Sequence, residues 1–349
     1  MAGRSRQGWG MTSCDLPRVS ISDPGELIET VPYLLGFHPR ESLVLIGFAG
    51  AEEHPGPQQV RVTVRIDLPA ASEVEELQPL VEVLLRADSA AMAAVLVTDA
   101  VPGDPRQTAT LMAWRDVLGE AMESAAIAIL DVLVATESRW WSLICEQPEC
   151  CPPAGHPRVL GCSAAAAQAT FAGMVALPDR EAMAATLAGR SSQERSALLP
   201  RLARAHAERA GASSEQAADR RKAEITDLLS AADLTAAELS ADDLVRYAVA
   251  LTDQQVRDAL WLAIDDGSIE ANRLMRELQT RLPAPYDAAP LFLFGWAQWR
   301  SGNATLAMMA AERVLESQPG YSAALLLHTA LQRGLDPRSV PVLSHAAAP

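Results

Sequence analysis

One short loop near the N-terminus contains three side chains that could take part in chemistry. It reads FHPRES over residues 37–42 and brings His38, Arg40 and Ser42 together. His38 could act as a general base, Ser42 as a nucleophile, and Arg40 as the partner of a carboxylate or phosphate. The GxSxG elbow that exposes many nucleophilic serines is missing around Ser42. The alternative is a loop that locks itself, with His38 or Arg40 bonded to backbone carbonyls or Arg40 paired with a nearby glutamate.

Charged side chains also follow the expected strands. Asp99 comes after an apolar strand at residues 92–98, and Glu137 and Arg139 follow another at residues 127–136. Ligands bind beyond the carboxyl ends of strands in open parallel sheets, so these side chains are candidates for a cation or for acid and base roles. Asp67, at the end of the strand expected at residues 60–68, belongs to this set if that strand is parallel and leaves it if the strand is antiparallel. The alternative is that these acidic residues cap helices and fill turns.

A cysteine-rich loop follows the last expected strand. Cys145, Cys150 and Cys151 form C-x4-C-C, and His156 comes shortly after. Three thiolates and one imidazole are a legitimate zinc set, although the spacing differs from C-x2-C knuckles and adjacent cysteines rarely chelate one metal well. Buried structural thiols and a disulfide from Cys145 are the alternatives, and a reducing cytosol disfavours the disulfide. Zinc is the one metal that this loop suggests, and no other cofactor is predicted.

Two tryptophans, Trp140 and Trp141, precede the cysteine loop. We expect one in the core and the other at the floor of a pocket, and we take Trp141 as the candidate for ligand contact. The chain has no GxGxxG and no Walker lysine loop, which argues against a nucleotide-binding enzyme.

The elements that position these side chains follow from hydrophobic periodicity. An apolar run at residues 42–48 predicts a strand buried on both faces, and alternation at residues 60–68 predicts a half-exposed strand antiparallel to it. Helices at residues 24–31, 72–87 and 105–122 separate or precede the strands, and such crossovers indicate a largely parallel arrangement. We therefore predict an α/β domain over residues 19–157 with a mixed, largely parallel sheet.

The chain changes character after this domain. Residues 162–335 are rich in alanine and leucine and predict an all-α helical domain. Within residues 288–321, Gly295, Ala307, Ala311 and Pro319 have the spacing of a tetratricopeptide repeat, which predicts tetratricopeptide-like helix pairs. The glycine would let two helices approach, and the alanines would fill their crossing. We expect a disordered tail at residues 1–18 and a flexible tail at residues 336–349.

The composition limits the class of protein. The 349 residues are 49% hydrophobic and 21% charged, which is typical of a soluble chain of about two domains. The net charge of −15 disfavours nucleic acid as a partner. No apolar run reaches the roughly 20 residues that span a bilayer, and the N-terminus lacks a secretory signal, so we predict no membrane contact and a cytoplasmic location.

Two stretches resemble a known family. VPYLLGFHPRESLVLIGF and RWWSLICEQPECCPPAGHP are similar to an actinobacterial family described as domain of unknown function 4192. The resemblance covers most of the chain, including the helical half. It implies a cytoplasmic bacterial protein with both parts of this fold, and it implies no mechanism because the family has no established activity.

Two classes of function fit these features. The first is a non-enzymatic binding or scaffold protein whose helical domain docks a protein partner on a concave surface. The alternative is a small-molecule hydrolase or transferase with its site at the sheet edge. Convergence of six side chains in one cleft would favour the enzyme; the six are His38, Arg40, Ser42, Asp99, Glu137 and Arg139.

Overall fold

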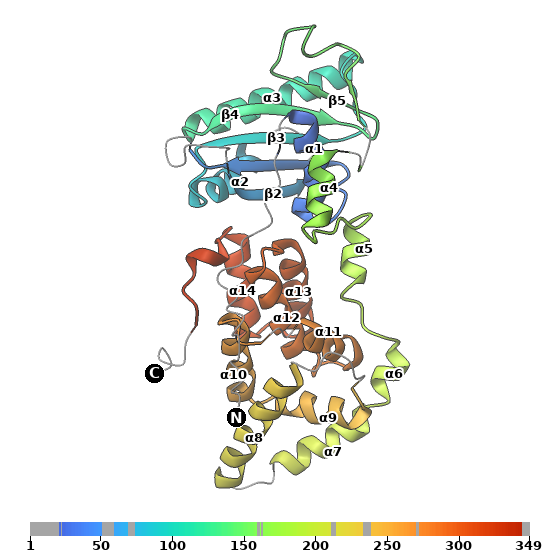
Figure 1. Ribbon diagram of the computed structural model, residues 1–349, viewed down its shortest axis with the longest axis vertical. Helices are drawn as coiled ribbons and strands as arrows, with labels where there is room; N and C mark the ends of the chain where they lie inside the picture. The colour runs from blue at the N-terminus through green and yellow to red at the C-terminus, as the bar shows by residue number, and fades with distance from the viewer. Residues whose placement is uncertain are drawn as a thin grey trace, which may run out of the picture.

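The computed structural model describes residues 21, 23–50, 59–68, 74–158, 161, 163–210, 214–232, 239–269 and 272–343. Figure 1 shows an α/β part at one end of an elongated molecule and a helical part at the other. The tail expected at residues 1–18 lies outside the described residues, as do residues 344–349 of the C-terminal tail.

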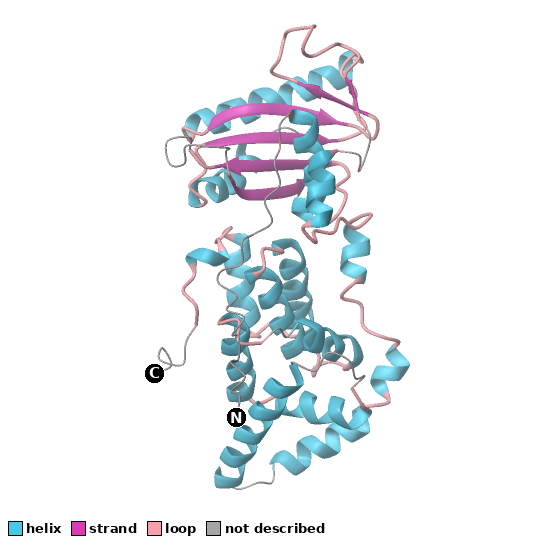
Figure 2. Ribbon diagram, in the orientation of Figure 1, coloured by secondary structure: helices cyan, strands magenta, loops and turns pink. Residues whose placement is uncertain are grey.

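One mixed sheet of six strands forms the centre of the α/β part, in the order β2-β1-β3-β4-β5-β6 (Figure 2). The strands are β1 Ser42–Phe48, β2 Val60–Asp67, β3 Ala91–Val97, β4 Ala128–Ala135, β5 Arg139–Ser142 and β6 His156–Pro157. Only β3 and β4 pair in parallel, and the other neighbours are antiparallel. The prediction of a largely parallel sheet was therefore wrong. The reason is that β1 inserts between β2 and β3, which run in the same direction but do not touch.

Helices cover both faces of the sheet. α2 (Val74–Arg86) and α3 (Pro105–Ser124) pack on one face, and α1 (Pro24–Leu35) and α4 (Ala164–Phe171) lie over the other. β1 is buried along its whole length, as its continuous apolar run predicts. Leu43 and Leu45 point into the core under α2 and α3, whereas Val44 and Ile46 point into the core on the side of α1.

The first helix is longer than Pro32 suggests. Asp23 caps it by accepting a hydrogen bond from the Glu26 N–H at 3.0 Å, and it runs through Pro32 to a left-handed C-cap at Gly36, with φ of 83°. We expected a break after Val31, because a proline disfavours helical backbone in the preceding residue. Burial of the apolar side of this helix in the core outweighs that local preference.

The described residues after β6 form helices. Their bounds are α5 Arg180–Ala185, α6 Ser192–Ser196, α7 Leu199–Ala210, α8 Ser214–Ala232, α9 Ala241–Ala250, α10 Gln254–Asp265, α11 Asn272–Arg281, α12 Ala288–Arg300, α13 Ala304–Ser317, α14 Ser322–Gln332 and the short 3₁₀ helix η1 Pro337–Ser339. None of the described helices has the length and apolar character needed to cross a membrane.

The expected close approach of α12 and α13 occurs at Gly295. A Cβ atom there would lie 3.0 Å from the Cβ of Ala310, so a larger residue would push the helices apart. Ala307 and Ala311 are fully buried between the helices. The wider resemblance to a tetratricopeptide repeat stays a prediction.

The two parts of the chain touch at the end of α14. Arg86 on α2 donates from Nη1 to the carbonyl of Arg333 at 3.0 Å, and Gly334 packs against Val83. A parallel bridge also joins Phe37 to Leu177, beyond α4. The domain boundaries at residues 157 and 162 stay predictions.

Candidate functional site

The predicted site residues gather at one edge of the sheet, which we call the loop edge. It consists of the loop before β1 and the loops after β2, β3 and β4. Because β1 is antiparallel to both β2 and β3, its first residue, Ser42, pairs with Asp67 at the end of β2 and with Val97 at the end of β3. Asp67 therefore belongs to this edge. The expectation that an antiparallel second strand removes it was wrong, since that strand is antiparallel to β1 alone.

Glu41 ties the loops of this edge together. Its carboxylate accepts hydrogen bonds from the Thr98 hydroxyl at 3.0 Å and the Asp99 N–H at 3.1 Å. Its carbonyl accepts from the N–H of Leu68 at 2.8 Å. The backbone of Glu41 has a φ of 37°, an uncommon value for a residue other than glycine. Glu41 is thus a structural brace, and the sequence pattern gives no signal for it.

Ser42 is buried and its hydroxyl is engaged twice. It donates to the Arg40 carbonyl at 2.6 Å and accepts from Arg65 Nε at 2.9 Å. Arg65 also forms an ion pair with Asp67 at 2.5 Å. A hydroxyl held in this way has no adjacent general base, so the geometry does not support Ser42 as a nucleophile.

His38 lies half-buried beside an ion pair that was not predicted from the sequence. Arg158, just after β6, places Nε 2.6 Å from Oε1 of Glu29 on α1, and each side chain is only 9% exposed. Arg158 also donates to the Thr136 carbonyl at 2.8 Å, and the Gly161 N–H donates to Glu29 at 3.1 Å. This Glu29–Arg158 pair connects α1 to the end of β4.

The surroundings of His38 lower the pKa of its imidazole. Burial is the main cause, the positive charge of Arg158 adds to it, and the negative charge of Glu29 opposes it. The backbone N–H of His38 donates to the Leu177 carbonyl at 2.9 Å. The neutral form of His38 is therefore favoured in the folded protein.

The other loop-edge candidates are exposed and form no hydrogen bond or ion pair with one another. Arg40, Asp99 and Glu137 are exposed, and their side chains make no hydrogen bond or ion pair with the described part of the chain. Arg139 faces elsewhere, with Nη1 2.9 Å from the carbonyls of Ala154 and Gly155. An internal brace from Arg40 to Glu41 or Glu137, one of the two alternatives for Arg40, is not formed. Arg139 instead supports the cysteine loop.

Trp141 is both a core residue and the wall of a cavity. It is 7% exposed, and its Nε1 donates to the Pro153 carbonyl at 3.1 Å. It borders a cavity of about 220 Å³ beneath the cysteine loop, together with Met112, Leu143 and Cys151. None of the six candidates for an enzyme site lines this cavity.

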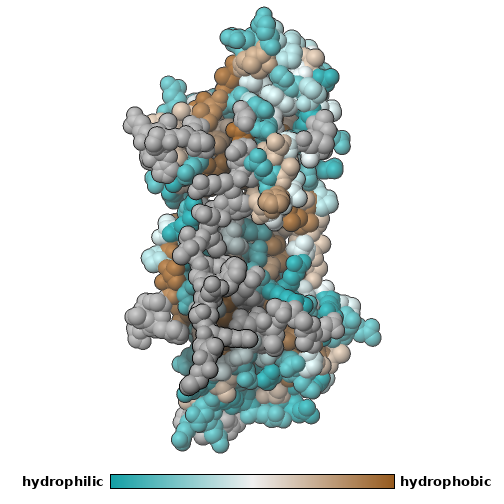
Figure 3. All heavy atoms as spheres, in the orientation of Figure 1, coloured by the Kyte–Doolittle hydropathy of each residue, from teal (hydrophilic) through white to brown (hydrophobic). Residues whose placement is uncertain are grey.

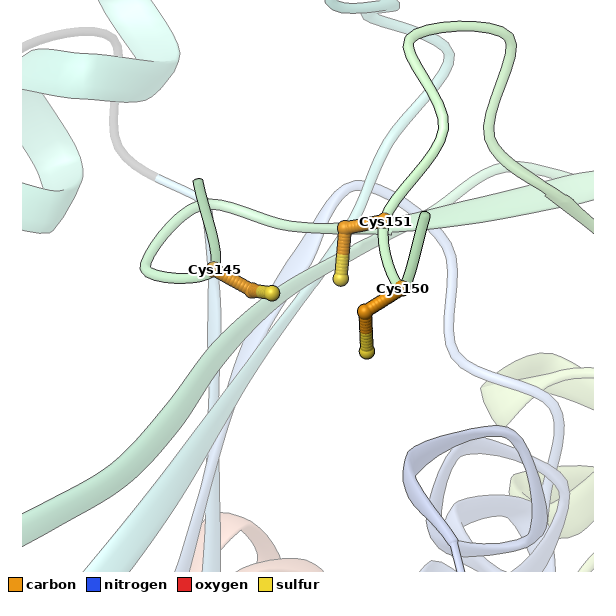
Figure 4. A group of neighbouring side chains, drawn as sticks. All are labelled: Cys145, Cys150 and Cys151. Atoms are coloured by element: carbon orange, nitrogen blue, oxygen red, sulfur yellow. The ribbon is translucent and has the colours of Figure 1, made fainter. Parts of the chain in front are cut away.

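The three cysteines of the loop come together. Their sulfur atoms all lie within 4.8 Å of one another, and all three are free thiols (Figure 4). The N–H groups of Cys150 and Cys151 both donate to the Gln147 carbonyl, at 3.0 and 2.7 Å, and this turn folds the adjacent cysteines back toward Cys145. Tetrahedral zinc with bonds of about 2.3 Å would need sulfurs about 3.8 Å apart, which small side-chain rotations could supply.

The thiols differ in their acidity. The pKa of Cys145 is lowered, chiefly by a hydrogen bond from the Cys151 thiol and then by a backbone hydrogen bond at Gln147. The pKa of Cys151 is raised to about 12, mainly by burial and by its hydrogen bonds with the other two thiols. The negative charge of Asp131 acts against ionisation of Cys145. The cluster thus makes Cys145 more acidic than an ordinary thiol and keeps Cys151 protonated.

His156 lies outside the thiol cluster. Its Nε2 is 2.8 Å from the Cys150 carbonyl, and because a carbonyl only accepts, this nitrogen carries the proton. Its ring stacks on Trp140 with centroids 4.2 Å apart. His156 therefore holds the loop backbone, and the group of possible metal ligands contains the three cysteines without it.

Comparison with known proteins identifies the family of this chain but no activity. No curated protein and no solved structure matches the chain significantly. The family model described as domain of unknown function 4192 matches residues 24–338, which include the loop edge, the thiol cluster and the helical part. The chain therefore belongs to the family of domain of unknown function 4192.

Proposed function

We propose that this chain is a non-enzymatic binding protein, with a thiolate metal site in its α/β part and a helical part that docks a protein partner. The observation that carries the proposal is the convergence of the three thiols. The side chains proposed for catalysis behave differently, because Ser42 is hydrogen-bonded inside the fold while Asp99 and Glu137 are exposed and form no hydrogen bond or ion pair with the described residues. That contrast supports binding over a hydrolase or transferase at the sheet edge.

Zinc is the metal that suits the thiol cluster. Thiolates select zinc and copper(I) over harder cations, and the lowered pKa of Cys145 makes it the first thiol to ionise when a metal binds. Three cysteines would leave the fourth position of a tetrahedral ion to water or to an external ligand. Reduced thiols persist in a reducing compartment, so the proposal includes a cytoplasmic location.

A metal here would stabilise the loop that closes the sheet. The loop is already held by Arg139 at the carbonyls of residues 154 and 155 and by Trp141 at the Pro153 carbonyl. An ion bound by Cys145 and Cys150 would fix its other side. Binding energy at such a site adds to folding energy, because the unfolded chain does not present the ligands together.

The charge pattern of the helical part supports a protein partner over nucleic acid. Arginines that could form a basic patch on α7 and α8 are paired with acids: Arg209 contacts Glu224 and Asp253, and Arg221 lies 2.6 Å from Asp253. Figure 3 shows hydrophilic residues over the end of the molecule formed by these helices. Leu325 and Leu326 on α14 are 43% and 64% exposed, and stacked helix pairs commonly bind protein segments.

The metal site can be tested directly. Protein purified without a metal-affinity column should contain about one zinc ion per chain, and Cys145→Ser with Cys150→Ser should remove it and lower the melting temperature. Cys14→Ser is the control for the number of thiols. Wild-type protein that takes up no zinc, and whose melting temperature does not rise with zinc, would refute the site.

A further inference from the structure

The described end of the chain is bound to the helical part. We call residues 336–343 the strap. It follows α14, contains η1, and in Figure 1 is the red trace that runs down from the end of α14 toward the end of α10. From the sequence we predicted a flexible tail at residues 336–349. The described part of that tail makes specific contacts.

A buried charged pair forms hydrogen bonds with the backbone of the strap. Asp265, at the end of α10, has a side chain with 0% exposure and lies 2.8 Å from Arg300 Nε on α12. Its Oδ2 accepts the N–H of Leu343 at 2.6 Å. Arg300 Nη1 donates to the carbonyl of Val340 at 3.1 Å and also to that of Pro337. The pair therefore accepts a hydrogen bond from the N–H of the last strap residue and donates hydrogen bonds to two carbonyls nearer the start of the strap.

Trp296, on α12, is the third residue of this site. Its Nε1 donates to Oδ1 of Asp265 at 2.8 Å, and Arg300 contacts the same oxygen. In the described part of the chain, Oδ2 receives its hydrogen bond from the strap. A buried carboxylate oxygen that loses its donor is costly, so this site needs an occupant.

The strap adds two apolar contacts. Val340 and Leu343 are partly buried and pack against the helical core, whereas Val342 between them is 54% exposed. The strap is thus recognised by backbone groups and by two apolar side chains three positions apart. The acidic side chain of Asp336 bonds to Arg338 within the strap and takes no part in this recognition.

We propose that the strap occupies, in cis, the docking site for an extended segment of a protein partner. The site consists of Asp265, Trp296 and Arg300 with the core surface under Val340 and Leu343. Because its polar contacts go to backbone atoms, another segment can satisfy them equally well if it has a short 3₁₀ turn, then extended residues, with apolar residues at the same spacing. This inference rests on the partner-docking part of the proposed function and names the chemistry of the partner.

The covalent connection favours the strap over a free segment. Tethering gives the strap an effective concentration that can strengthen binding by a factor of 10² to 10⁴, by the usual rule for linked sites. A partner segment therefore binds weakly until the strap is released. The strap acts as an internal competitor that sets the threshold for docking.

The test uses a labelled peptide with the sequence of residues 336–349 and the full 349-residue chain. In the released variant, Val340→Asp and Leu343→Asp remove both apolar contacts. In the control variant, Val342→Asp adds charge at the exposed position. Fluorescence anisotropy should show that the released variant binds the peptide about a hundredfold more tightly than the wild type or the control variant. A peptide with the two aspartates should not bind.

A released variant that keeps its cooperative unfolding transition but binds no peptide would overturn the inference. Asp265→Asn in the released background should weaken peptide binding at least tenfold, and unchanged binding would also overturn it. A different result is expected if the strap does occupy this site but the helical part docks no protein partner. The released variant would then bind the peptide yet retain no protein from an extract of the native host.

Discussion

Arg158 and Glu29 form a buried ion pair that joins two segments 129 positions apart in the sequence, with Nε 2.6 Å from Oε1. The pair holds α1 against the chain that leaves β6, and Arg158 reaches the carbonyl that ends β4. His38 stands next to both charges. The stability of the loop edge should therefore depend on this pair more than on the exposed side chains around it.

Arg158→Leu should lower the free energy of unfolding by about 3–5 kcal/mol, because it leaves the Glu29 carboxylate buried without a counter-charge. The double variant Glu29→Leu, Arg158→Leu should recover part of that loss, since no charge then remains buried. Urea unfolding of the two variants and the wild type measures both effects. Equal stability of the single variant and the wild type would show that the pair contributes nothing.

His38 should make stability depend on pH. Its pKa is lowered in the folded state, so the unfolded chain binds the proton more readily. The wild type should be fully stable above about pH 6.5, the ordinary histidine value, and should lose stability as pH falls through the lowered folded-state pKa. His38→Gln should show a smaller decrease over the same window, and His328→Gln controls for removal of a histidine. Parallel pH profiles for the wild type and His38→Gln would contradict the assignment.

Arg40→Ala should change little by itself. The Arg40 side chain is exposed and forms no hydrogen bond or ion pair with the described residues, so the free energy of unfolding should stay within about 0.5 kcal/mol of the wild type. A loss of 1–3 kcal/mol, the usual cost of a lost charged hydrogen bond, would indicate a brace that the structure lacks. Thermal and urea unfolding of this variant separate the two results.

The sequence predicts individual elements well where burial is uniform. The bounds of β1 match the predicted strand at residues 42–48, because an unbroken apolar run of that length is typical of a strand buried on both faces. Gly295 was expected to let two helices approach, and the structure places Ala310 at that contact. Local chemistry was enough in these cases.

Relationships between distant segments could not be predicted in the same way. Nothing in β1 itself says that it inserts between β2 and β3, and that insertion decides which side chains share the loop edge. The partner of Arg158 lies on the first helix, so no local pattern reveals it. The thiols converge through a turn at the Gln147 carbonyl. The C-x4-C-C spacing alone argued against a shared metal site, because it does not reveal this turn.

Gly155 should be essential for the shape of the cysteine loop. Its φ is +71°, and a Cβ atom there would lie 2.4 Å from Cε2 of Trp141. Gly155→Ala should therefore cost more stability than Gly267→Ala, where φ is +73° and the space around the Cβ is open. The control isolates the backbone strain, of order 1–3 kcal/mol, from the clash with Trp141. Equal losses in melting temperature would mean that Trp141 moves aside without cost.

Zinc binding should become tighter as pH rises. Cys151 has a pKa raised to about 12, so near neutral pH it holds a proton that a metal ion must displace to gain a third thiolate. Each proton released on binding makes the apparent affinity increase about tenfold per pH unit. Competition with a chelator of known affinity between pH 6.5 and 8.5 measures this slope. Cys151→Ser should bind zinc more weakly and with a shallower slope, since both a ligand and its proton are lost, whereas Cys14→Ser should match the wild type. A wild-type affinity that does not change with pH would mean that Cys151 is not a ligand.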